Sequence, residues 1–268
     1  MTISPEEEAR RRALLAAFIG AMLARFGALT TFRTKPRSAA AISATTEIAI
    51  TAIELLLSLA LREFGVGLIA TAFGRDGLAF AAFTFAAVPS AVLHGDCVPV
   101  LVEVGHDFRI DMTDFRMKLA EGAGAVMISH MRGHTSDMDQ IMAACDAAGV
   151  PVIEDAAHSL GTLWDGRRIG TIGKVGCFSF QSYKLVNAGE GGMLVTDDPE
   201  IAARAIIMSG AYEHNWKKHP GLQNSFHHWQ NRLPLYNLRM QNLSAAVIRP
   251  QLPEIDRRVR DGRANHGR

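Results

Sequence analysis

From about residue 83, short apolar runs with the composition of β-strands alternate with helical stretches, and this alternation is the strongest constraint on the fold. The strand-like runs span residues 99–104, 125–129, 150–154, 175–180 and 193–196. The helical stretches span residues 114–120, 138–148 and 199–208. Such alternation predicts an α/β fold, a mostly parallel sheet sandwiched by helices. Ligands of such sheets bind at the carboxyl ends of the strands, so polar residues there are the first candidates for a functional site.

Two of the predicted helices carry local signals at their ends. Gly149 directly follows the stretch 138–148 and is a good C-cap. Asp198 precedes the stretch 199–208 as a predicted N-cap, and Pro199 suits the first helical position.

Charge and cysteine content exclude several classes of protein. The 268-residue chain has 28 Lys and Arg against 27 Asp and Glu, a net charge of +1, whereas nucleic-acid binders need a basic surplus. The three cysteines, Cys97, Cys145 and Cys177, are odd in number and far apart. They predict neither a disulfide framework nor a metal site, and they fit a cytoplasmic location.

Two early apolar runs are predicted to be helices rather than membrane segments. The run 13–23 follows three arginines, as in a signal peptide, but three glutamates precede these and the run is too short to span a bilayer. A secretory protein remains the less favoured alternative. The run 48–61 contains Glu54, which indicates a helix with one apolar face.

Three features sit where a parallel sheet would place its ligand. Asp155 comes directly after the run 150–154, and a carboxylate there can hold a protonated ring nitrogen. Ser179 lies at the end of the run 175–180, five residues before Lys184, which suits a phosphate contact beside an amine nucleophile. The glycine-rich segment 189–192 permits a tight turn next to a ligand.

Each feature alone has an ordinary structural explanation. An aspartate after a strand is more often a helix cap, a single lysine is usually a solvated surface group, and a glycine run is usually a turn. His158 alone is more often a hydrogen-bonded structural residue than a base. The occurrence of all these features in one order favours a functional site, since isolated short motifs match by chance.

The ordered series resembles the DegT/DnrJ/EryC1/StrS aminotransferases, pyridoxal-phosphate (PLP) enzymes of fold type I that aminate keto-sugars or cyclitol ketones. The segments that carry the resemblance are Glu154-Asp155-Ala156-Ala157-His158-Ser159-Leu160-Gly161, Asp165-Gly166-Arg167-Arg168-Ile169-Gly170, residues 176–180, Lys184 and Gly189-Glu190-Gly191-Gly192. Weaker matches lie at residues 82–85, 99–104, 130–139 and 236–246. Together they cover about residues 82–260.

The resemblance implies the roles of the catalytic residues. Lys184 would bind PLP covalently and then move a proton on the substrate, and Asp155 would keep the pyridine nitrogen protonated. The amino donor would be glutamate or glutamine, and the acceptor a keto-sugar, often nucleotide-linked, or a cyclitol ketone. A relative that uses PLP for sugar deoxygenation carries histidine at the position of Lys184, so the lysine favours transamination over dehydration.

The resemblance also implies further cofactor contacts. Phe85 matches the aromatic residue that stacks on the cofactor ring, His158 matches a position near its hydroxyl group, and Ser179 matches a phosphate ligand. Asn237 and Arg239 match positions that reach the phosphate of a neighbouring subunit, which implies a homodimer. Which of these two residues makes that contact stays open.

The phosphate-binding turn departs from the family pattern. In one alignment the segment 72–78 forms this turn, so Gly74 and Arg75 would hold the phosphate while Phe73 and Arg75 replace two hydroxyl residues. An alternative alignment places the turn at residues 43–46 and its helix at 47–61, which keeps the hydroxyls. The first alignment is slightly favoured, and Arg75 could itself bind phosphate.

The predicted organisation has three parts. Residues 1–45 form an N-terminal helical and loop segment, and residues 46–250 form the PLP-binding large domain. Residues 251–268 would be the first turns of the helix that leads into the family's smaller C-terminal domain, which is largely absent. The arginine-rich end of the chain is expected to be an exposed helix with nothing to pack against.

Three functional hypotheses follow from these features. The leading one is a PLP-dependent sugar or cyclitol aminotransferase, truncated or remodelled. The second is a catalytically impaired homologue that binds PLP or serves as an interaction subunit, which the altered turn and missing domain would favour. The third, an unrelated nucleotide-binding α/β domain, ranks low because no G-x-G-x-x-G follows the first strand.

Overall fold

The structure is a computed structural model that describes residues 77–267 apart from 96 and 211–218, all within one compact unit. Gly74, Arg75, the proposed turn 43–46 and the two early apolar runs lie outside the described residues. The other proposed turn, 72–78, is described only at Gly77 and Leu78, which lie in a strand. No described helix is both long and apolar enough to cross a bilayer.

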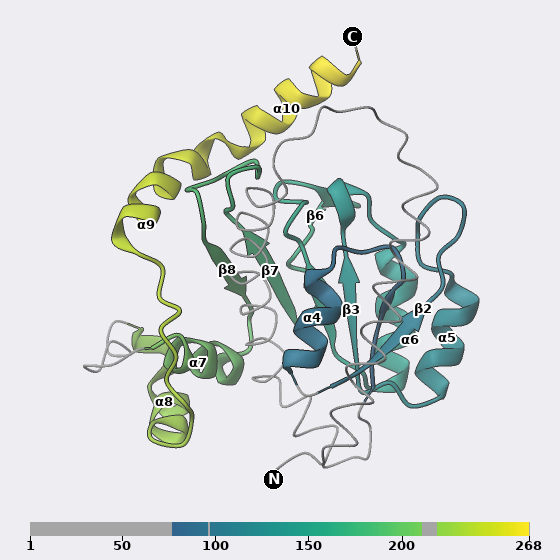
Figure 1. Ribbon diagram of the computed structural model, residues 1–268, viewed down its shortest axis with the longest axis horizontal. Coiled ribbons are helices and arrows are strands. Elements are labelled where there is room, and N and C mark those ends of the chain that lie inside the picture. Colours follow the sequence, from purple (N-terminus) through teal and green to yellow (C-terminus); the bar gives the residue numbers. More distant parts are fainter. Residues whose placement is uncertain (1–76, 96, 211–218, 268) are drawn as a thin grey trace, which may run out of the picture. The chain divides into compact units, whose positions relative to one another are not determined.

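A six-stranded sheet forms the centre of the described chain (Figure 1). Its strands, in spatial order, are β2 (Val98–Val102), β1 (Gly77–Ala81), β3 (Ala125–Ser129), β4 (Val152–Asp155), β7 (Val175–Ser179) and β8 (Gly192–Val195). All neighbouring pairs are parallel except β7 and β8, which are antiparallel. The expected mostly parallel sheet is confirmed. A separate antiparallel pair consists of β5 (Leu163–Trp164) and β6 (Arg167–Arg168).

The described residues also form seven α-helices. They are α4 (Ala87–His94), α5 (Met112–Ala120), α6 (Met138–Ala148), α7 (Pro199–Met208), α8 (Gln223–Trp229), α9 (Asn242–Ile248) and α10 (Ile255–His266). Short 3-10 turns are η1 (Met131–Gly133), η3 (Pro220–Leu222) and η4 (Arg249–Glu254).

The buried core explains why the strand sequences are apolar on both faces. Successive side chains of a strand point to opposite faces. Val126 of β3 packs in one cluster with Phe115 of α5 and Ile141 of α6. Phe80 and Met127 lie outside that cluster, yet they are 1% and 0% exposed, so the second face is covered as well. Burial of both faces is typical of parallel sheets with helices on each side.

The helix ends follow the local signals in the sequence. Asp198 accepts hydrogen bonds from the backbone N–H groups of Glu200 at 2.9 Å and Ile201 at 3.2 Å, as an N-cap does. Gly149 ends α6 with φ of +64°, the left-handed conformation expected of a C-cap.

Two sequence predictions were wrong in detail. The fourth run was expected to end at Glu154, but β4 continues to Asp155, so this aspartate is the last residue of the strand rather than the first residue after it. The arginine-rich end of the chain was expected to pack against nothing. Instead, Arg258 of α10 donates through Nη1 to the Leu185 carbonyl at 2.6 Å.

Candidate active site

The candidate site is a pocket of about 340 Å³ at the carboxyl end of β7. Its lining residues are Arg132, Ala157, His158, Leu160, Ser179, Tyr183, Lys184 and Leu185. Three of the residues predicted from sequence, His158, Ser179 and Lys184, therefore share one pocket. Lys184 is held in a turn after β7, in which its backbone N–H donates to the Gln181 carbonyl at 2.9 Å.

Asp155 is 6% exposed at the end of β4, beside this pocket wall. Ser129 Oγ, at the register-matched end of β3, donates to Asp155 Oδ2 at 2.7 Å, and the Ala157 N–H donates to Oδ1 at 3.1 Å. These two hydrogen bonds fix the orientation of the carboxylate. A buried, oriented carboxylate can accept a hydrogen bond from a protonated ring nitrogen.

The charges in the pocket act on one another. Desolvation lowers the pKa of Lys184 below its ordinary value, and the nearby Asp155 carboxylate opposes this shift. A lowered pKa leaves more of the amine unprotonated at neutral pH, as a nucleophile or base requires. Although part of its ring is exposed, His158 also has a lowered pKa, first through desolvation and then through the positive charge of Lys184.

An aromatic ring approaches the same pocket from β1. Phe85 follows the end of that strand, and its ring centroid lies 6.4 Å from that of His158 at an interplanar angle of 62°. The ring is 38% exposed. The carboxyl ends of β1, β4 and β7 thus bring Phe85, Asp155 and Lys184 into one region, although their contacts with a cofactor stay predictions.

Ser179 is 3% exposed at the end of β7. Its Oγ accepts a hydrogen bond from the Gln181 N–H at 3.3 Å, which leaves the hydroxyl hydrogen to be donated. A phosphate oxygen could accept that hydrogen, but the assignment of Ser179 to phosphate stays a prediction.

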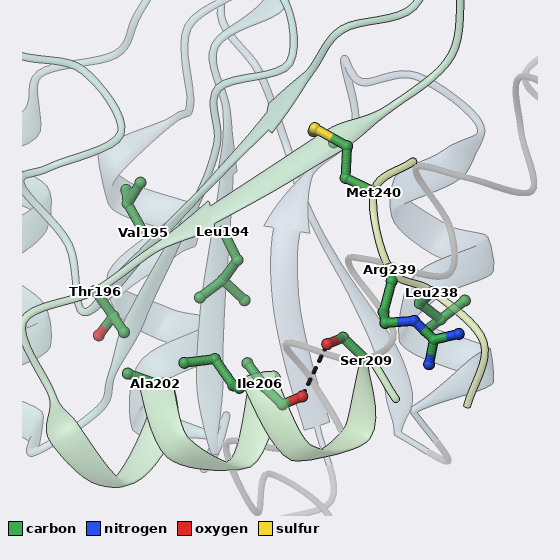
Figure 2. Close-up of a pocket in the computed structure, with 11 residues that line it drawn as sticks. Leu194, Val195, Thr196, Ala202, Ile206, Ser209, Leu238, Arg239 and Met240 are labelled. Atoms are coloured by element: carbon green, nitrogen blue, oxygen red, sulfur yellow. Dashed lines mark hydrogen bonds between the residues drawn. The ribbon is translucent and has the colours of Figure 1, made fainter. Parts of the chain in front are cut away.

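Asn237 and Arg239 do not line the Lys184 pocket. Arg239 donates to the Gly210 carbonyl and, at 3.2 Å, to Asn237 Oδ1. It lines a different pocket, of about 420 Å³, which Figure 2 shows between β8, α7 and residues 238–240. The prediction that these residues reach a cofactor in a neighbouring subunit stays untested.

A buried polar network was not predicted from the sequence. Glu154, 0% exposed, accepts hydrogen bonds from the backbone N–H groups of Gly170, Ile172 and Gly173 at 2.6–2.7 Å. His130 Nε2 lies 3.1 Å from its carboxylate. Burial alone would raise the pKa of Glu154, but these hydrogen bonds outweigh it and lower the pKa. A glutamate directly after the apolar residues Val152 and Ile153 of a buried strand is the signal that could have revealed this network.

The pocket suits PLP by the chemistry of its donors. Asp155 would supply a buried acceptor for the ring nitrogen, and Lys184 would supply an amine with a lowered pKa. The hydroxyls of Thr84, next to Phe85, and of Ser159, next to His158, are buried and have no hydrogen-bond partner among the described residues. Such orphaned hydroxyls fit a site that gains polar partners when it binds a ligand.

The mostly parallel α/β sheet agrees with the fold that the resemblance to PLP enzymes of fold type I implied. The DegT/DnrJ/EryC1/StrS aminotransferase family matches residues 25–268. The chain therefore belongs to this family.

Individual relatives agree with this assignment. The chain is 34% identical over 191 residues to a putative PLP-dependent aminotransferase, EpsN, of Bacillus subtilis, covering 69% of this chain and 47% of that protein. It is 31% identical to GDP-perosamine synthase of Vibrio cholerae, covering 66% and 46%. The crystal structure of 3-amino-5-hydroxybenzoic acid synthase, 28% identical, superposes with a TM-score of 0.62 over 76% of this chain and 50% of that one. The chain spans about half the length of the curated relatives it matches.

Proposed function

We propose that this protein is a PLP-dependent aminotransferase that moves an amino group from glutamate or glutamine to a ketone on a sugar or a cyclitol. The observation that carries the proposal is the position of Lys184. Its amine lines a pocket with His158, its pKa is lowered by desolvation, and it interacts electrostatically with the buried Asp155.

Each residue in and beside the pocket would have a separate role in the proposed reaction. Bound PLP would supply the electron sink that lets a Cα–H bond of the donor break. Lys184 Nζ would take that proton and deliver it to the C4′ carbon of the cofactor, since its lowered pKa raises the fraction of the amine that is free to accept a proton. Asp155, fixed by Ser129 and Ala157, would hold the proton on the ring nitrogen. His158 would stay neutral, as a hydrogen-bonding group beside the ring.

The acceptor is proposed to be a keto-sugar, often nucleotide-linked. The relative named GDP-perosamine synthase supports a sugar substrate. A cyclitol ketone is the alternative, because it presents the same carbonyl chemistry with neighbouring hydroxyl groups.

We further propose that the protein is a homodimer in the cytoplasm. Arg239 and Asn237 bond to each other and line no part of the Lys184 pocket, which fits a role towards a second subunit. Cys145 and Cys177 are buried free thiols, as a reducing compartment favours. Sedimentation equilibrium of the chain with PLP should give twice the mass of one chain.

Covalent labelling tests the proposed function. The protein is loaded with PLP, reduced with borohydride and digested, and the labelled peptide is mapped. We expect the label on Lys184, no label in Lys184→Ala, and at least a 100-fold loss of amino transfer in that variant. Lys174→Ala is a matched control, since Lys174 is half-exposed and paired with Asp198.

The outcomes separate the hypotheses. A label on another residue, or no label, would contradict the proposal. If Lys184 is labelled, glutamate or glutamine should bleach the yellow absorbance of the loaded protein. Labelling without bleaching by either donor would instead support a homologue that binds PLP without catalysing transfer.

A further inference from the structure

Arg132 has an unusual backbone at the edge of the Lys184 pocket. It lies in η1, directly after β3 and His130, with φ of 54° and ψ of 27°. This left-handed conformation is uncommon for residues other than glycine, and such residues cluster at functional sites. The conformation places Arg132 in the lining of the pocket that Lys184 and His158 share.

The guanidinium group has no protein partner in the part of the chain that the structure describes. Arg132 is exposed, and no hydrogen bond or ion pair to it is formed by the described residues. Its charge nevertheless reaches the pocket, because it contributes to the lowered pKa of His158. An exposed cation that lines a pocket without a carboxylate partner is available to an anionic ligand.

Arg132 adds to the pocket a positive charge that an anionic group of a ligand could neutralise. Arg132 and Lys184 are both basic, and Asp155 is the nearby acid. The Asp155 carboxylate is already bonded to Ser129 and Ala157 and faces the place of a ring nitrogen. A ligand that reacts at Lys184 and carries a carboxylate would therefore find its counter-charge at Arg132 rather than be repelled.

We propose that Arg132 binds the α-carboxylate of the amino donor and so selects amino acids over simple amines. This inference rests on the proposed function, because every α-amino acid donor carries a carboxylate on the carbon whose proton must move. The keto-sugar or cyclitol acceptor has no such group at its reacting carbon. A guanidinium can bind a carboxylate through two parallel hydrogen bonds, which fixes orientation as well as position.

The variants are chosen so that loss of binding is not confused with loss of folding. Arg132→Gln removes the charge and keeps much of the length, and Arg132→Lys keeps the charge but not the two-pronged geometry. Arg132→Gly removes the side chain and relieves the left-handed backbone, so this variant should fold at least as well as the parent. Arg116→Gln, an exposed arginine of α5 whose guanidinium bonds to Gln140, is the matched control.

The first measurement does not depend on the cofactor. Glutarate, an unreactive dicarboxylate, is titrated calorimetrically into the apo-protein, and inorganic phosphate is titrated in parallel. We expect glutarate to bind about ten-fold more weakly to Arg132→Gln and Arg132→Gly than to the parent. This loss of affinity is near the lower end of the range for a hydrogen bond to a charged group, because the guanidinium is exposed to solvent. Arg132→Lys should be intermediate, and Arg116→Gln should match the parent.

The second measurement uses the PLP-loaded protein. The parent should be bleached at least ten-fold faster by L-glutamine than by L-glutaminamide, in which a carboxamide replaces the α-carboxylate. Arg132→Gln should lose most of this preference and still be labelled at Lys184 by borohydride.

Four results would overturn the inference. Equal glutarate affinity in parent and Arg132→Gln, or an unchanged preference for L-glutamine, would exclude Arg132 as the carboxylate site. An equal loss of affinity for phosphate or PLP would assign Arg132 to the cofactor instead. Failure of Lys184 to be labelled in the parent would reject the proposed function itself, which distinguishes the two failures.

Discussion

The pKa of His158 reflects the charges of several residues in and beside the pocket. Desolvation and the positive charges of Lys184 and Arg132 disfavour its protonated form, while Asp155 favours it, and the net effect is a lowered pKa. Three strand ends are needed to bring these groups together. The sequence resemblance identified His158, Lys184 and Asp155 as candidate site residues. The residues around Arg132 gave no sequence signal that Arg132 would line the same pocket.

A histidine with a lowered pKa makes stability depend on pH in a defined direction. The unfolded chain binds a proton at His158 near pH 6.5, whereas the folded protein binds it only at lower pH. The stabilising contribution is therefore fully present above pH 6.5 and is lost as the pH falls through the folded pKa. We expect the free energy of unfolding of the parent to fall more steeply between pH 7.5 and 5.5 than that of His158→Gln.

Urea denaturation at a series of pH values measures this difference. Other groups with lowered pKa values, such as Glu154 and Asp198, are carboxyls that are present in both proteins, so they cancel in the comparison. Parallel curves for the parent and His158→Gln over this range would contradict the assigned environment of His158.

At the scale of the elements, β4 links the core to the site through two adjacent carboxylates. Asp155 interacts electrostatically with Lys184. Glu154 bonds to the segment 170–173 and to His130, at the start of the turn after β3. Gly176 of β7 allows this segment to approach, because a Cβ there would overlap the Gly170 carbonyl. The network therefore positions the strand that carries Asp155.

We expect Glu154→Gln to lower the free energy of unfolding by about 3 kcal/mol. The amide nitrogen cannot accept a hydrogen bond, so at least one buried N–H donor loses its partner, and the charge that favours the remaining bonds is gone. Glu121→Gln is the control, since the exposed Glu121 pairs with Lys118 at the surface and the substitution should change stability by less than about 1 kcal/mol. Denaturant titration of both variants gives the comparison, and equal stabilities would contradict the structural role of Glu154.

Local signals decided how well each element could be predicted. The strand 125–129 and the helices 138–148 and 199–208 were predicted with the observed bounds, since apolar patterns and caps such as Gly149 act within a few residues. The helices α8 and α9, of seven residues each, were not predicted. Their buried residues Phe226 and Ile248 pack in clusters assembled from distant segments, and a sequence pattern does not reveal such contacts.

At the scale of the whole described unit, the C-terminal segment formed by η4 and α10 forms hydrogen bonds with the loop that carries Lys184. Gln251 Nε2 donates to the Asn187 carbonyl at 2.7 Å, and Arg258 Nη1 donates to the Leu185 carbonyl at 2.6 Å. Val259 packs at Gly161, where an added Cβ would lie 2.8 Å from it. The arginine-rich composition of this segment predicted an exposed helix. It could not predict that an arginine would bond to a backbone carbonyl in a loop about 70 residues earlier in the chain.

We therefore expect Arg258→Met to make the loop that carries Lys184 less stable, although Arg258 lies outside that loop. The variant keeps an extended apolar side chain but loses hydrogen bonds to the Leu185 carbonyl and to Gln251 Oε1, which should lower the free energy of unfolding by about 1–2 kcal/mol. Hydrogen exchange should speed up in a peptide covering residues 181–190, and retention of PLP should weaken. Asp256→Asn is the control, because its pair with Arg168 is exposed and contributes about 0–1 kcal/mol. Unchanged exchange in this peptide for Arg258→Met would show that α10 does not support the site.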